Sequence, residues 1–396
     1  MLAATVRVTR DLDTAEEAVQ DAYVQALETW GRDGVPARPG AWLTTVARRR
    51  ALNLLRRRRT LEAKLPLLLE PAGAQPPDPA TDDDPDAIPD DRLRLVFTCC
   101  HPALAVEAQV ALTLRLVCGV ATPDVAHAFL VSEPTMAARI TRAKKKIAAA
   151  RIRYAVPAAG ELPARVDAVL TVIHLLYTTG HTAPGGETLV RDELTGRALD
   201  LARMLHALLP AEREAAGLLA LLLVHEARRA TRTDAAGRML RLAEQDRTAW
   251  DRDLIAEADG LLVRALRAGP PGRFLLQAAI AALHAQAPAH DATDWPQILA
   301  LYDELLRVWP SPVVALNRAV AIAMVEGAGP ALAAVEALEG DGRLAGYRYL
   351  HATKADLLHR LGRDAEAAAA YRAALALTDN AAERAFLAGR LGAEEA

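Results

Sequence analysis

Arginine is concentrated in one short segment of the first sixty residues. Seven guanidinium groups fall within the twelve positions 48–59. A guanidinium stays charged at any physiological pH, and its donors fit phosphate oxygens. One helix face cannot hold so many like charges without a polyanion to screen them, so the segment indicates nucleic-acid binding. The alternative interpretation is a solvated charged face.

A second basic cluster lies along the second of two short predicted helices. The sequence predicts one helix near residues 122–129, a tight connection, and a second helix that Ser132 caps and Pro134 begins. This is the pattern of a helix-turn-helix, although helical hairpins in ordinary bundles resemble it. We expect its early residues to meet base edges and its late bases to hold phosphates. The predicted DNA contacts are Ser132, Thr135, Met136, Arg139, Arg142 and Lys145.

The net charge of −3 conceals a strong division along the chain. Residues 1–60 hold 11 arginines against 7 acids, and residues 92–153 hold 10 bases against 3 acids. Between them, residues 61–91 hold one lysine against 9 acids and are rich in proline. We therefore predict two basic modules joined by an acidic, proline-rich linker.

The apolar spacing predicts helices throughout, and hence an all-α fold. Leu12, Ala15 and Val19 recur at three- and four-residue steps and define the apolar side of a first amphipathic helix. The acidic side of this helix carries Glu16, Glu17, Gln20 and Asp21. A second helix begins near Ala41 and becomes the arginine-rich segment.

From residue 161 to residue 396 the sequence is an alanine- and leucine-rich helical tail. Near its end, Ala367, Tyr371 and Ala374 fall at the spacing of a tetratricopeptide unit. Tyr302 lies 69 residues before Tyr371, close to two periods of 34. The tail is therefore predicted to be a helical-repeat domain, and such domains commonly bind peptides or other protein elements.

Three segments together resemble bacterial extracytoplasmic-function (ECF) sigma factors. They are the acidic run 13–23, the segment 42–51 that begins Trp-Leu-Thr-Thr-Val-Ala, and the helix-turn-helix. The Phe-Thr-Cys-Cys-His-Pro segment at 97–102 and the long tail resemble the subgroup with a tetratricopeptide-like C-terminal extension. The resemblance implies two small helical sigma domains, 1–60 and 92–153, joined by the linker 61–91 and followed by the extension 161–396.

The resemblance also implies partners and residue roles. Glu16, Glu17, Gln20 and Asp21 would bind the clamp helices of the RNA polymerase core. The helix-turn-helix would read the −35 promoter element, and the arginine-rich helix would melt and read the −10 element. The residues implied for the −10 element are Trp42, Thr45, Arg48, Arg49 and Asn53. The extension would regulate activity in cis, by contact with its own chain, or would bind a regulatory protein.

For Trp42 and for the charged motifs of the tail, the sequence allows two interpretations each. Trp42 is equally suited to stacking on melted bases and to anchoring the core against the first helix. In the tail, charged motifs predict a docking site for the sigma domains or a ligand, and an interhelical ion-pair network is the alternative. The residues of this site are Arg228, Arg229, Asp246, Arg247 and Trp250.

The sequence offers little for catalysis. No nucleophile is paired with a base, and no glycine motif would cradle a phosphate, so we expect no enzyme activity and no cofactor. Cys99 and Cys100 are expected to be buried thiols rather than metal ligands. The three cysteines, the lack of a leader and the absence of a long apolar run lead us to expect a cytoplasmic protein without membrane contact. The alternative function is a helical scaffold whose basic segments bind nucleic acid nonspecifically.

Overall fold

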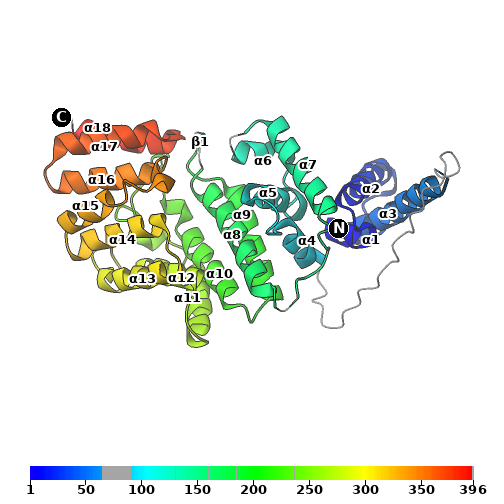
Figure 1. Cartoon of the computed structure of the whole chain (residues 1–396), viewed down its shortest axis with the longest axis horizontal. Coiled ribbons are helices and arrows are strands. Elements are labelled where there is room, and N and C mark those ends of the chain that lie inside the picture. Colours follow the sequence, from blue (N-terminus) through cyan, green and yellow to red (C-terminus); the bar gives the residue numbers. More distant parts are fainter. Residues whose placement is uncertain are drawn as a thin grey trace. The chain divides into compact units, whose positions relative to one another are not determined.

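The computed structural model describes residues 1–64, 91–129, 131–158, 160–183, 185–186, 188–235 and 237–394. These residues form helices almost throughout, which confirms the predicted all-α class (Figure 1). The chain divides into two compact units. Unit 1 comprises Met1–His127 and Val131–Val172, and unit 2 comprises residues 128–130 and Ile173–Ala396. Most of the predicted linker 61–91 lies outside the described residues.

Unit 1 contains both basic segments. Its helices are α1 (Leu2–Thr9), α2 (Leu12–Asp33), α3 (Pro39–Lys64), α4 (Asp91–Cys99), α5 (Val106–Leu112), the π-helical turn η2 (Thr113–Val117), α6 (Thr122–Ala128) and α7 (Glu133–Ala149).

Small side chains allow the first three helices to pack closely. Along α2, Ala15, Ala18, Ala22 and Ala26 are buried at the spacing of one helix face. Helices α1 and α3 both pack against α2. The Asp11 carboxylate caps α2 by accepting a hydrogen bond from the Thr14 backbone nitrogen at 2.7 Å. This packing fixes which sides of α2 and α3 remain available to partners.

The two basic segments are also held together within unit 1. The Tyr154 hydroxyl lies 2.8 Å from the Ala3 carbonyl oxygen and 2.7 Å from that of Asp91, so it joins the starts of α1 and α4. Helix α1 packs directly against α4. The Arg165 guanidinium donates to the Phe97 carbonyl oxygen at the other end of α4.

Unit 2 is built from helices that pack against their neighbours in sequence. After α8 (Leu162–His181), which begins in unit 1, the elements are β1 (Gly185–Gly186), α9 (Asp192–Leu208), α10 (Arg213–Ala227), η3 (Arg229–Thr231), η4 (Arg247–Ala249), α11 (Arg252–Arg267), α12 (Arg273–Gln286), α13 (Trp295–Val308), α14 (Pro312–Val325), α15 (Ala328–Glu336), η5 (Gly342–Leu344), α16 (Arg348–Arg360), α17 (Asp364–Ala376), β2 (Asp379–Asn380) and α18 (Ala381–Glu394).

Helices α10 and α12 approach each other unusually closely. A Cβ atom at Gly217 would lie 2.7 Å from the backbone nitrogen of Leu275, so a larger residue does not fit there without a shift of the backbone. The Glu214 side chain of α10 caps α12, because it accepts hydrogen bonds from Gly272 N at 3.0 Å and Phe274 N at 2.7 Å. These contacts fix α10 and α12 relative to each other.

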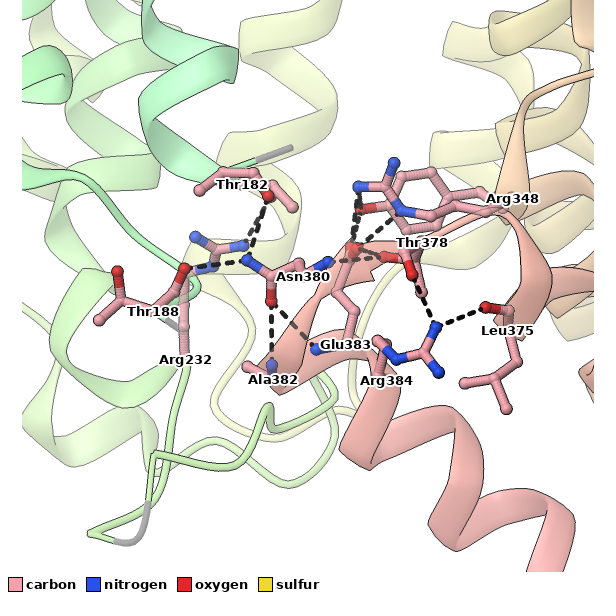
Figure 2. Close-up of polar contacts among 12 residues, drawn as sticks. Thr182, Thr188, Arg232, Arg348, Leu375, Thr378, Asn380, Ala382, Glu383 and Arg384 are labelled. Atoms are coloured by element: carbon pink, nitrogen blue, oxygen red, sulfur yellow. Dashed lines mark hydrogen bonds and ion pairs between the residues drawn. The ribbon is translucent and has the colours of Figure 1, made fainter. Parts of the chain in front are cut away.

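The first and last segments of unit 2 are joined by one buried asparagine (Figure 2). The Asn380 side-chain nitrogen donates to the carbonyl oxygens of Ala183 at 3.1 Å and Thr188 at 2.9 Å. Its side-chain oxygen accepts from Ala382 N at 3.0 Å and Glu383 N at 3.2 Å, which caps α18. The parallel pairing of β1 with β2 lies at the same joint.

A buried carboxylate adjoins this joint. Glu383 is 2% exposed and accepts hydrogen bonds from Tyr349 at 2.5 Å and Thr378 at 2.7 Å (Figure 2). Oε2, the oxygen that accepts from Thr378, also lies 2.7 Å from Nε of Arg348, so the negative charge is neutralised where it is buried. The carboxylate therefore links α16 to the start of α18.

Removing the Asn380 side chain should destabilise unit 2. Asn380→Ala leaves the carbonyl oxygens of Ala183 and Thr188, the first of them buried, without their donor and removes the cap of α18. From the usual size of such losses we expect about 2–4 kcal/mol of lost stability. Urea denaturation followed by circular dichroism measures the effect. Asp379→Ala, in the exposed neighbour, is the matched control; an equal loss in both variants would refute the role of Asn380.

Candidate nucleic-acid interface

One side of α3 presents the predicted basic face to solvent. Thr45, Arg48, Arg49 and Asn53 are all exposed, and their spacing of three and four residues places them along one stretch of the helix surface. The opposite side is closed by Ala47 and Ala51, which are fully buried. Among the described residues, Arg48, Arg49 and Arg50 have no ion-pair partner. The face thus carries positive charge that the described part of the protein does not neutralise.

Trp42 lies at the beginning of this face and contacts another tryptophan. Its ring centroid is 5.4 Å from that of Trp30 on α2, with an interplanar angle of 60°. Trp42 is half-buried, so part of its ring remains accessible. The contact with Trp30 is what the packing interpretation of Trp42 expects, and the partial exposure of Trp42 leaves the stacking interpretation open.

Helix α7 begins as the sequence predicts. The Ser132 hydroxyl accepts a hydrogen bond from the Thr135 backbone nitrogen at 3.4 Å and lies 2.8 Å from the Thr135 hydroxyl. Ser132, Thr135, Arg142 and Lys145 are exposed, whereas Arg139 is half-buried. The helix packs against α5 through the side that faces away from these residues.

The predicted base contact by Met136 is wrong. Met136 is fully buried, together with Ile140, Ala143 and Ile147. These four residues recur at steps of four, three and four, which is the core stripe of an amphipathic helix. Met136 therefore anchors α7 to unit 1 and cannot touch a base in this conformation.

The acidic side of α2 is partly occupied by the basic helix α7. Lys144 Nζ donates to Asp13 Oδ1 at 2.8 Å and also to Glu16 Oε2. The second oxygen of Glu16 lies 3.3 Å from a guanidinium nitrogen of Arg115. The Glu16 and Lys144 side chains are 15% and 14% exposed, so the pair is largely shielded from water. Glu16, predicted to bind a partner, is thus engaged inside unit 1.

Electrostatics favour this contact. Burial by itself lowers the pKa of Lys144, but its hydrogen bonds to Asp13 and Glu16 outweigh burial and raise the pKa above the ordinary value. Lys144 is therefore charged throughout the physiological range of pH.

The remaining residues predicted for the acidic face of α2 differ in exposure: Glu17 and Gln20 are exposed, and Asp21 is half-buried.

Lys144 and Arg115 are the functional candidates that sequence reasoning missed. Nothing in the local spacing brings residue 16 beside residues 115 and 144. The available signal is charge complementarity between an acidic helix face and a run of three lysines.

Two of the three cysteines lie in the core of unit 1, and Cys118 is half-buried. Cys99 and Cys100 are fully buried, as expected, and Cys100 Sγ lies 3.5 Å from the Thr113 hydroxyl. Burial raises the pKa of Cys100 to about 12, so its thiol stays protonated and unreactive. Within the described ranges, no group of three histidine, cysteine or acidic side chains is placed to hold a metal ion.

The structure brings together only some of the residues predicted to dock in the tail. Arg228 and Trp250 line one cavity of unit 2, and Arg247 lies with its Cζ 4.8 Å from the centroid of the Trp250 ring. Arg229 instead pairs with Asp192 at 2.5 Å and Glu226 at 2.8 Å. Asp246 is exposed and caps η4 by accepting from Thr248 N at 2.9 Å. Arg229 therefore belongs to an ion-pair network between helices, which was the alternative to a docking role.

None of the helices among the described residues combines the length and apolar character that crossing a bilayer requires.

Comparison with known proteins gives two family matches, one at the start of unit 1 and one that lies mostly in unit 2. Residues 2–60 match sigma-70 region 2, and residues 165–266 match a family of unknown function, DUF6596. An uncharacterized protein of Rhizobium meliloti (strain 1021) is 44% identical over 388 residues, which cover 98% of this chain and 91% of that protein. The chain belongs to the same family as that protein. The match to region 2 supports a sigma-70 family factor with a role in transcription initiation. No solved structure matches the chain.

The contact between α2 and α7 should be measurable as an energetic coupling. We expect Glu16→Gln and Lys144→Met to be coupled by about 1 kcal/mol, between the values typical of exposed and buried pairs. A double-mutant cycle on urea unfolding measures this coupling. Glu17→Gln with Lys145→Met is the matched control, because both residues are exposed, and its coupling should be near zero. The same coupling in both cycles would show that the pair contributes nothing specific.

Proposed function

We propose that the chain is an ECF-type sigma factor, which binds the RNA polymerase core and directs promoter-specific transcription initiation. The observation that carries the proposal is the exposed basic face of α3, which lies within the residues that match sigma-70 region 2. In this proposal, residues 1–60 bind polymerase and the −10 element, and residues 92–153 bind the −35 element through a helix-turn-helix. Residues 61–91 are the linker, and residues 161–396 are a tetratricopeptide-like extension.

The chemistry of α3 suits melted DNA. Single strands are bound by positive charge along the backbone together with surfaces on which bases stack. Arg48 and Arg49 supply charge without a competing carboxylate among the described residues, and Thr45 and Asn53 supply hydrogen-bonding groups beside it. Half-buried Trp42 is the aromatic residue of α3 closest in sequence to this face.

The acidic face of α2 gives the polymerase site in this proposal. Glu17 and Gln20 are exposed and ready to bind, whereas Glu16 is held by Lys144 and Arg115. A polymerase that uses all of this face must displace Lys144, which then becomes free to bind a phosphate. In this proposal, polymerase binding and the availability of the Lys144 charge for DNA are linked through the carboxylates of Asp13 and Glu16.

The tail is proposed to regulate this activity in cis. Its support is the alignment with the Rhizobium meliloti protein, which continues through the tail and covers 98% of the chain. The described part of the tail also forms a closed structural unit, since Asn380 ties its last helix to the segment after α8.

Run-off transcription with RNA polymerase core tests the function. We expect promoter-dependent product from the full chain and a loss of roughly tenfold or more for Arg48→Gln with Arg49→Gln, because two phosphate-binding charges are removed. The matched control is Arg264→Gln with Arg267→Gln, in two exposed arginines of α11. Absence of any promoter-dependent product would favour the scaffold alternative.

The same assay tests regulation by the tail. Asn380→Ala, at a temperature where the variant remains folded, should change the amount of product, whereas Asp379→Ala should not. Equal product from both variants and the parent chain would contradict regulation in cis.

The two kinds of contact by α7 should be separable. Arg139→Ala should change the preference among −35 sequences, because it removes a group that hydrogen-bonds to base edges. Lys145→Ala should weaken all promoters alike and reduce the salt slope by about one, because it removes a phosphate contact. Promoter-binding titrations at several salt concentrations measure both effects. A uniform loss over all sequences for Arg139→Ala would exclude base reading by that residue.

A further inference from the structure

Unit 2 contains a cavity of about 370 Å³. Its walls come from α10, α12, α13 and α14, of which each packs against the next, and from the connector after α10. The volume lies near the lower end of the usual range for small-molecule sites, roughly 300–1,000 Å³. Asn317, which also lines the cavity, is exposed, and this places one side of the cavity at the surface. A small molecule can therefore reach it.

Arg228, at the end of α10, brings an unneutralised charge to this cavity. Its Nη2 lies 3.3 Å from Nδ1 of His225, and its Nε is buried without a hydrogen-bond partner among the described residues. Burial and the neighbouring Arg232 lower the pKa of Arg228 to about 10, so it stays charged at neutral pH. Its sequence neighbour Arg229 has two carboxylate partners. The described part of the chain thus neutralises Arg229 and not Arg228.

The surroundings of Arg228 add positive charge rather than remove it. Arg247 is 8% exposed, and it donates to the backbone carbonyl oxygens of His284 and, at 2.9 Å, Ala287. Its Nη2 is buried and has no partner among the described residues. No aspartate or glutamate lines the cavity in the described part of the chain. A buried cation without a counter-charge is costly, and an anion that enters the cavity offsets that cost.

Two histidines of the cavity supply neutral donors. An arginine donates and never accepts, so Nδ1 of His225 accepts from Arg228 and the ring proton lies on Nε2. Burial, together with Arg228 and Arg247, lowers the pKa of His284 to about 4. Burial likewise lowers the pKa of His225 well below its ordinary value. Both rings are uncharged at neutral pH and add hydrogen-bonding capacity without adding to the repulsion.

The rest of the lining is apolar or aromatic. Leu221, Val224, Ile280, Leu305 and Val314 contribute aliphatic surface. Trp250, which donates to the Thr231 hydroxyl at 2.9 Å and is thereby held in place, and Tyr302 contribute aromatic surface. Inorganic phosphate would leave this surface unused, whereas an organic anion with an apolar body covers it.

We propose that this cavity binds a small organic monocarboxylate with an apolar or aromatic body, with the carboxylate at Arg228 and the body among the aliphatic and aromatic side chains. Binding by this site does not depend on the role of the chain in transcription.

Isothermal titration calorimetry with the full chain tests the proposal. The probes are benzoate, phenylacetate, hexanoate and octanoate, with phenylacetamide as the uncharged analogue and inorganic phosphate as the anion without an apolar body. We expect at least one carboxylate to bind and its amide or phosphate to bind roughly ten- to hundredfold more weakly, as for loss of one charge-assisted hydrogen bond and its apolar contacts. If none of the four carboxylates binds, or if phosphate binds more tightly than all of them, the proposal is overturned.

Variants locate the binding. Arg228→Gln should weaken carboxylate binding at least about tenfold. Arg267→Gln, an exposed arginine of α11, should leave it unchanged. Ala281→Phe fills the cavity without touching a charge, so it should abolish binding of every probe; it carries the test if Arg228→Gln fails to fold. Unchanged binding in Ala281→Phe would place the ligand elsewhere and refute the site.

Discussion

A guanidinium or ammonium group that keeps its charge must be met by an acceptor wherever water is scarce, and this constraint organises both units. In unit 2, Arg348 meets the buried Glu383 carboxylate, and Arg232 and Arg384 meet backbone carbonyl oxygens. In unit 1, Lys144 meets Glu16. Two other cases among the described residues are informative: Arg48 and Arg49 are exposed without an ion-pair partner, and half-buried Arg228 has a buried nitrogen without a partner in a cavity that no described carboxylate lines. At each of them we propose that an external anion binds.

Both expected anion sites depend on contacts made far from them. The α3 face points to solvent because the opposite side of the helix, with Ala47 and Ala51, is buried in the packing of α1, α2 and α3. The cavity of unit 2 exists because Gly217 and Glu214 fix α10 against α12 while Trp250 is tied to Thr231. Such fixed walls keep a buried charge in place, because a mobile side chain would escape to water.

Local residue patterns predict individual helices and their ends, but not the contacts between distant helices. The cap at Ser132, the all-α class and the burial of Cys99 and Cys100 follow from neighbouring residue types, and the structure agrees with each. Met136 was misassigned because its place near a capped helix start outweighed its spacing to Ile140, which is equally visible in the sequence. The joint at Asn380 is different: its partners lie 192 and 197 residues away, and no local signal predicts such a pairing.

The Glu16–Lys144 contact shows why an ion pair of moderate strength suits a switch. While Asp13 and Glu16 hold Lys144, they neutralise its charge, so Lys144 attracts a phosphate less strongly than the exposed bases of α7 do. A fully buried pair would cost several kcal/mol to break, which is too much for a reversible exchange. The Glu16 and Lys144 side chains are 15% and 14% exposed, so the pair keeps some contact with water. Such a pair is weak enough for a binding partner to replace it. When a partner binds Glu16, Lys144 loses that carboxylate, and more of its positive charge becomes available to a phosphate.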